Sequence, residues 1–217
     1  MKIAKKSPRQ AARELALLGI SQLPKNKEKL DKKKLQELLL AAVRTLTMEA
    51  DECLEKAAEE LQKASDRLLS SQIGVTDIKS ARSMVYEGIE LSQTAINEIG
   101  TAIELPELIQ LTNQPEVRSY ALEILIAVNS NTAEIDKLLE KSIVNWQIKR
   151  LPRLDLDILR IAVGEILYLG LPEQIAIEEA VKLAKRYSGE DGYKFINGVL
   201  ARVGEKMKAD TALASEV

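Results

Sequence analysis

Histidine is absent from this sequence, so the commonest general base and metal ligand of proteins is missing. Cys53 is the only cysteine, which excludes an internal disulfide and a cysteine-based zinc site. Neither a GxxxxGK[ST] phosphate-binding loop nor a GxGxxG turn occurs. Asp155 and Asp157 are two residues apart and would point in different directions on a helix, which makes a poor catalytic pair. We therefore expect no enzymatic activity and no metal or cofactor.

Aromatic residues make up only 3 % of the 217 residues, and ten glycines and six prolines leave little material for hairpin turns. Leu, Ile, Ala, Glu and Lys dominate instead, which favours an all-α protein. No apolar run approaches the roughly 20 residues that span a bilayer. The basic start MKIAKKSPRQ is followed by Ala11-Ala12-Arg13-Glu14 rather than by an apolar segment, so we expect no signal peptide. Together with the single cysteine, this predicts a cytoplasmic protein of a bacterial type without membrane contact.

The formal charge of −2 is unevenly distributed along the chain. Residues 1–34 carry eleven Lys or Arg against three acidic residues, a net charge of +8, and the remainder carries −10. A basic arm on an acidic body suggests a polyanionic partner at one end. The alternative is a solvated, fraying terminus.

Helical patterns cover most of the chain. Ser7, Pro8 and Gln10 form a capping-box pattern at the start of a first helix that ends before Pro24. On that helix Arg9 and Arg13 are four residues apart, and we expect both on a solvent-facing side. Residues 35–104 are predicted to form a long antiparallel hairpin because two apolar runs recur in steps of three and four. The runs are Leu39, Ala42, Leu46, Ala50, Cys53, Ala57, Leu61, Ala64 and Leu68, then Ile78, Ala81, Val85, Ile89, Ser92, Ile96, Ile99 and Ile103.

Pro106 and Pro115 are predicted to mark a joint after the hairpin. Helices are then expected over 116–128 and 133–145, with a possible break at 129–132, and over 154–169 and 173–187. A last helix should begin near Asp191 and bury Ile196 and Val199, with Phe195 at the edge of its apolar stripe.

The segment GEDGYKFINGVL, residues 189–200, holds the only phenylalanine of the chain beside a cation at a helix start. Lys194 can contact a phosphate and Phe195 can stack on a base, which is what single-stranded RNA requires of a protein. An ordinary core phenylalanine and a solvated lysine are the alternatives.

Three segments carry a family resemblance. The first comprises Glu134-Ile135-Asp136, Asn145-Trp146, Arg150-Leu151 and Ile158-Leu159-Arg160-Ile161-Ala162 with Glu165; the second runs from Ala176 to Lys185; the third runs from Lys194 to Leu200. In this order they resemble the NusB transcription antitermination family, and residues 7–23 with Ala12-Arg13-Glu14 resemble its first helix. The resemblance covers about residues 1–23 and 114–204, so the long hairpin looks like an insertion.

The resemblance implies NusB-like helical bundles and a four-part organisation. Residues 1–34 would form the basic arm and first helix, 35–113 the inserted helical hairpin packed on the same domain, 114–208 the C-terminal NusB-like bundle, and 209–217 a frayed tail.

The resemblance also implies a transcription antitermination factor that supports ribosomal RNA transcription. Its partners would be single-stranded boxA RNA, the ribosomal protein NusE and the RNA polymerase antitermination complex, with no DNA. Carried over residue by residue, the resemblance implies RNA contacts at Arg13, Asp191, Lys194 and Phe195, and Asp155 would lie at the NusE surface. The basic arm and first helix add Lys5, Lys6 and Arg9 to the expected RNA-binding residues.

Two aromatic residues typical of the family are missing, since Ser21 and Ser142-Ile143 stand at those points. One stacked base is worth roughly 1–3 kcal/mol, so we expect weak RNA binding by the chain alone and stronger binding with NusE. A helical scaffold that acts through residues 35–104 is the alternative. The same helical domain also precedes a methyltransferase domain in some ribosomal RNA cytosine methyltransferases, but this sequence ends shortly after the last segment.

Overall fold

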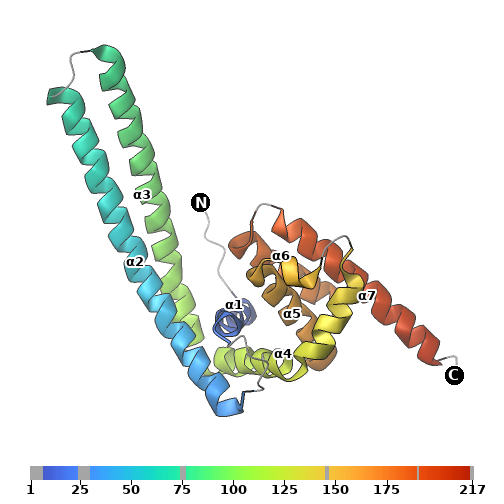
Figure 1. Cartoon of the computed structure of the whole chain (residues 1–217). Coiled ribbons are helices and arrows are strands. Elements are labelled where there is room, and N and C mark those ends of the chain that lie inside the picture. Colours follow the sequence, from blue (N-terminus) through green and yellow to red (C-terminus); the bar gives the residue numbers. More distant parts are fainter. Residues whose placement is uncertain (1–6, 24–29, 74–76, 145–146, 190, 216–217) are drawn as a thin grey trace. The chain divides into compact units, whose positions relative to one another are not determined.

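The computed structural model describes residues 7–23, 30–73, 77–144, 147–189 and 191–215, and side chains up to residue 209 apart from residue 104. The described residues form seven α-helices and one 3-10 turn and contain no strand, which confirms the all-α prediction (Figure 1). The elements are α1 (Pro8–Ser21), α2 (Lys32–Ile73), α3 (Ile78–Thr112), α4 (Pro115–Ser142), η1 (Ile148–Arg150), α5 (Arg153–Tyr168), α6 (Glu173–Tyr187) and α7 (Gly192–Ser215). Within this described part, no helix is long and apolar enough to cross a bilayer.

The chain divides into two compact units, residues 1–42 with 112–217, and residues 43–111. In the first unit α5 is the central helix and packs on α1, α4, α6 and α7. Its apolar residues 158, 159 and 161–163 are buried and form the centre of the core. The helix α1 is almost as buried, with residues 11–17 enclosed mainly by α4 and α5.

The predicted helix signals are confirmed at several ends. The Ser7 side chain accepts a hydrogen bond from the Gln10 amide at 3.2 Å, and the Gln10 side chain accepts one from the Ser7 amide at 3.1 Å. This reciprocal box starts α1. In α4 the two predicted helices form one, with non-helical backbone at Asn131. The Asn131 side-chain amide donates to the Ala127 carbonyl at 2.9 Å, so a polar residue that competes for backbone groups lies at the kink.

The second unit is an antiparallel hairpin of α2 and α3 (Figure 1). The predicted small residues Cys53, Ala57 and Ala64 of α2 are buried. On α3 the buried small residues are Gly88, Ala95 and Ala102, each seven positions from the next, and Leu105 and Leu108 are buried nearer its C-terminal end. A Cβ atom at position 88 would lie 3.2 Å from Leu68 Cγ and 3.4 Å from the Ala64 carbonyl oxygen, so the helices approach closely at this glycine.

The prediction that both apolar runs are buried between α2 and α3 is wrong for most of their large residues. Leu61 and Leu68 of α2 are exposed, and so are Ile78, Val85, Ile89, Ile96 and Ile103 of α3. The reason is that two helices in contact through small residues leave no room for branched side chains between them. The large side chains are therefore displaced from the line of contact to its flank.

Two predicted boundaries also differ. The helix α3 continues through Pro106 to Thr112, because a proline removes one backbone hydrogen bond without necessarily ending a helix. The joint therefore lies at Asn113 and Gln114, before Pro115 opens α4. The helix α7 extends to Ser215, into residues 209–217 that were predicted as a frayed tail.

Candidate nucleic-acid interface

Arg9 is exposed at the start of α1, as predicted. Its guanidinium carbon lies 3.7 Å from the centroid of the Tyr120 ring of α4. A guanidinium stacked on an aromatic face is attracted to the ring and restricted in its rotamers. Arg9 is thus held at the surface with a defined orientation while its charge stays accessible.

The prediction that Arg13 lies on the same solvent-facing side as Arg9 is wrong. Arg13 is only 3 % exposed, and its Nε lies 2.9 Å from Glu165 Oε2 of α5. Its Nη1 lies 3.3 Å from Glu179 Oε2 of α6. The α1 helix is enclosed by its neighbours nearly all round, so the face opposite Leu15 meets carboxylates rather than water.

Tyr120 completes this buried cluster, because its hydroxyl donates a short hydrogen bond to Glu165 Oε1. Burial raises the pKa of Tyr120 to about 12, and the hydrogen bond to Glu165 adds to the shift. The phenol therefore stays protonated at neutral pH and remains a donor. The cluster of Arg13, Tyr120, Glu165 and Glu179, which we call the α1 clamp, joins α1, α4, α5 and α6.

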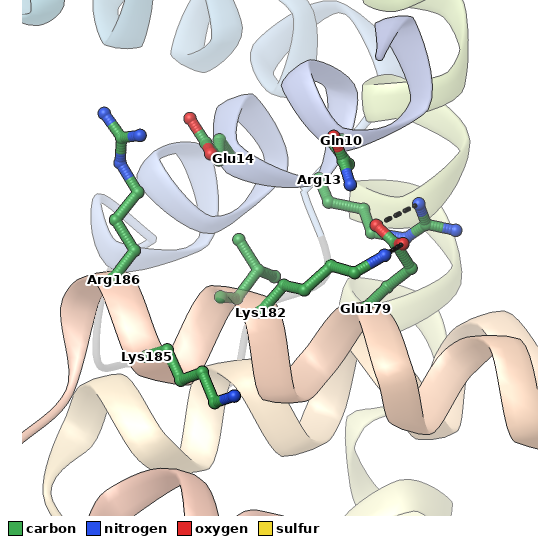
Figure 2. A pocket seen from close by; sticks show the side chains of 8 residues that line it. Gln10, Arg13, Glu14, Glu179, Lys182, Lys185 and Arg186 are labelled. Atoms are coloured by element: carbon green, nitrogen blue, oxygen red, sulfur yellow. Dashed lines mark hydrogen bonds and ion pairs between the residues drawn. The ribbon is translucent and has the colours of Figure 1, made fainter. Parts of the chain in front are cut away.

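A hollow of about 330 Å³ lies between α1 and α6, beside this clamp (Figure 2). Gln10, Arg13 and Glu14 line it from α1, and Glu179, Lys182, Leu183, Lys185 and Arg186 line it from α6. Lys182, Lys185 and Arg186 are exposed, so α6 places three cations around the hollow. Lys182 Nζ is paired with Glu179 Oε1 at 2.6 Å.

The predicted residues Asp191, Lys194 and Phe195 come together at the start of α7. Lys194 Nζ lies 3.0 Å from Asp191 Oδ1, and this hydrogen bond raises the pKa of Lys194. Both charged groups are exposed, and Phe195 is partly exposed. The stacking surface and the cation therefore share one helical turn, and Asp191 immediately precedes α7.

Tyr193 is a residue of this surface that the sequence reasoning missed. Its ring centroid lies 5.2 Å from Lys185 Nζ of α6 and 5.8 Å from Lys194 Nζ. The side chain is partly exposed, so a second aromatic ring flanked by two ammonium groups lies two residues before Phe195 in the chain. Adjacency to Lys194 was the available signal, whereas the proximity of Lys185 follows only from the packing of α6 on α7.

Asp155, predicted to lie at a partner surface, is buried instead, with 7 % of its surface exposed. Ser188, which follows α6, donates a hydrogen bond of 2.5 Å from its Oγ to Asp155 Oδ1. Gly192 packs against Ser188 so closely that a Cβ atom there would lie 1.9 Å from Ser188 Oγ. The Asp155 carboxylate is thus used within the fold, where it anchors Ser188 at the end of α6 to the start of α5.

Lys5 and Lys6 lie outside the described residues, as do Asn145 and Trp146. Arg160 pairs with Asp136 through two hydrogen bonds of 2.8 and 2.9 Å, which assigns it a structural role. No group of three or more side chains suited to hold a metal ion occurs among the residues with described positions.

Known proteins resemble this chain over most of its length. The sequence pattern of the NusB family matches residues 79–205, so the match begins within α3 rather than after the hairpin. The transcription antitermination protein NusB of Trichodesmium erythraeum is 69 % identical over 94 % of this chain and 98 % of its own length. The protein of the same name from Nostoc punctiforme is 56 % identical over the same shares, and that from Microcystis aeruginosa is 52 % identical over 94 % of each chain.

These names describe transcription antitermination and no catalytic reaction. Identity at this level over nearly the whole chain includes the hairpin as well as the bundle around α5. The chain belongs to the NusB family of transcription antitermination proteins.

Proposed function

We propose that this chain binds single-stranded boxA-type RNA of ribosomal RNA leaders together with the ribosomal protein NusE, and so acts in the antitermination complex of RNA polymerase. The observation that carries the proposal is the cluster of Lys185, Tyr193, Lys194 and Phe195 where α6 meets α7. Two partly exposed rings, one of which has two ammonium groups beside it, can stack bases while the cations hold the neighbouring phosphates. The names of the relatives support the coarser part of this proposal, a role in transcription antitermination.

The proposed RNA surface also includes the exposed cations of α6 and Arg9 on α1. Asp191 belongs to it through its ion pair with Lys194, which fixes the ammonium next to Tyr193. Lys5 and Lys6 remain proposed contacts of the basic arm. Arg13 is not included, because its guanidinium would have to leave both carboxylates to reach a ligand.

Asp155 is likewise not proposed as a direct NusE contact. Its role is to position the segment that carries Asp191, because it holds Ser188 at the end of α6. The proposed NusE contacts therefore lie among the exposed residues of the bundle around α5.

The test is a titration of fluorescently labelled boxA-type RNA with the full chain, with and without NusE. Tyr193→Ala and Phe195→Ala should each weaken binding by about 1–3 kcal/mol, since each removes one stacking platform. The matched control is Tyr86→Ala, because Tyr86 of α3 is also an exposed ring beside a cation, with the guanidinium carbon of Arg82 5.5 Å from its centroid. Unchanged affinity for both α7 variants in the presence of NusE would overturn the stacking role.

A further inference from the structure

The hairpin of residues 43–111 has one apolar and one polar face. Leu54, Leu61 and Leu68 repeat every seven residues on α2, and each exposes between 40 % and 52 % of its surface. Ile89, Ile96 and Ile103 repeat every seven residues on α3 and expose between 57 % and 60 %. Each of these isoleucines directly follows a buried small residue of the seam, namely Gly88, Ala95 or Ala102.

Both stripes lie on the same face of the hairpin. Each is displaced from its own seam in the same rotational sense along its helix, and because the helices are antiparallel these displacements point to the same side.

The residues that precede the seam positions lie on the other side and are polar. They are Lys56 and Lys63 on α2, and Glu87, Thr94 and Thr101 on α3. Arg67 Nε of α2 reaches Glu87 Oε2 at 3.2 Å, so the two helices are bridged by charge there.

We propose that this apolar face is the contact between two copies of the chain, which pack hairpin on hairpin as an antiparallel four-helix bundle. A layer with one apolar face must bury it against another layer, and the simplest closed solution is a two-fold dimer. The seven-residue repeat of the stripes needs a partner with the same repeat to interdigitate, and a second copy supplies it.

The charge distribution selects the antiparallel arrangement. Residues 61–86, around the tip, carry four basic and two acidic residues, a net charge of +2. Residues 43–60 and 87–111 carry two basic and eleven acidic residues, a net charge of −9. In an antiparallel dimer each tip meets the acidic end of the other copy, whereas a parallel dimer would oppose the two acidic ends.

The first test is the molar mass of the full chain in solution, measured by sedimentation over a range of concentrations. Ile96→Lys places an ammonium in the proposed contact and should raise the dimer dissociation constant by on the order of 100-fold or more. Thr94→Lys adds the same charge two residues away on the polar face and should leave it unchanged. Since Thr94 and Ile96 are both exposed, circular dichroism should show unchanged helix content in both variants. A monomeric unmodified chain, or equal behaviour of the two variants, would overturn the proposal.

The second test fixes the orientation by cross-linking in a Cys53→Ala background. Leu61→Cys lies near the middle of the hairpin, so its thiol should form a disulfide with its own copy under mild oxidation. Ile78→Cys lies at the tip and should not, because antiparallel packing separates the two tips by roughly 45 Å for about 30 helical residues. Disulfide formation at Ile78 with none at Leu61 would overturn the antiparallel arrangement.

Discussion

The guanidinium of Arg13 illustrates how the role of a residue depends on what its helix meets. Arg9 and Arg13 are separated by one helical turn, yet their surroundings differ. Arg9 stacks on the Tyr120 ring, whereas Arg13 is enclosed by two carboxylates. A cation that loses its water is stabilised only by such partners, and each partner then depends on the cation. The α1 clamp therefore makes Arg13 a residue of the fold.

We predict that Arg13→Met lowers the free energy of unfolding by about 3–5 kcal/mol, because it leaves the buried Glu165 without its cation. The measurement is urea unfolding followed by circular dichroism. Lys182→Met is the control, since Lys182 also pairs with Glu179 but is exposed, and its loss should cost at most about 1 kcal/mol. At temperatures where the Arg13→Met variant stays folded, its RNA affinity should equal that of the unmodified chain. A selective loss of RNA affinity would show instead that Arg13 contacts RNA.

At the scale of elements, the end of α6 and the start of α7 determine where the proposed RNA surface lies. Ser188 at the end of α6 is hydrogen-bonded to Asp155 of α5, and Gly192 at the start of α7 leaves room for Ser188. The rings of Tyr193 and Phe195 follow directly in α7. A polar side chain on α5 thus positions aromatic residues on another helix without being exposed itself.

Ser188→Ala should lower the free energy of unfolding by about 1–3 kcal/mol, because the buried Asp155 carboxylate loses a part-buried hydrogen bond. It should also weaken RNA binding, as the start of α7 is no longer fixed. Thermal unfolding and the RNA titration measure the two effects. Ser119→Ala is the control for stability, since Ser119 makes an exposed hydrogen bond of 3.3 Å to Glu123 and should change little. Equal stability of both variants would mean that the Ser188 anchor contributes nothing.

At the scale of the whole molecule, the acidic hairpin and the cations of α6 and α7 give the chain regions of opposite charge, although its net charge is only −2. RNA would be attracted by the second region and repelled by the first. Binding should therefore depend steeply on salt, because phosphate contacts release counterions.

Lys194→Ala should reduce the slope of log affinity against log salt concentration by about 0.7, the value for one phosphate contact on a single strand. Lys63→Ala is the matched control, since Lys63 is exposed and pairs with Glu60 three residues away, as Lys194 does with Asp191. Titrations over several salt concentrations provide the measurement. If both variants shift the slope equally, the effect comes from net charge and Lys194 has no local contact.

The sequence by itself determined the class of the fold, most helix boundaries and the family. Caps, prolines and apolar periodicity act within a few neighbouring residues, so the Ser7 box, the kink at Asn131 and the start of α7 after Asp191 follow from local pattern. The same holds for Phe195, whose place at the edge of an apolar stripe predicted its partial exposure.

Only the tertiary structure decided which polar residues are buried and which apolar ones are exposed. Arg13 meets a carboxylate 152 residues away, Asp155 meets Ser188 across 33 residues, and Lys185 reaches Tyr193 across a change of helix. In the hairpin both the small and the large residues repeat with helical periodicity, so periodicity alone does not tell which set lies between the helices. The close approach of the two helices at Gly88 shows that the small ones do. The physical reason is that periodicity gives each helix its faces, whereas the burial of a face depends on the helix that packs against it.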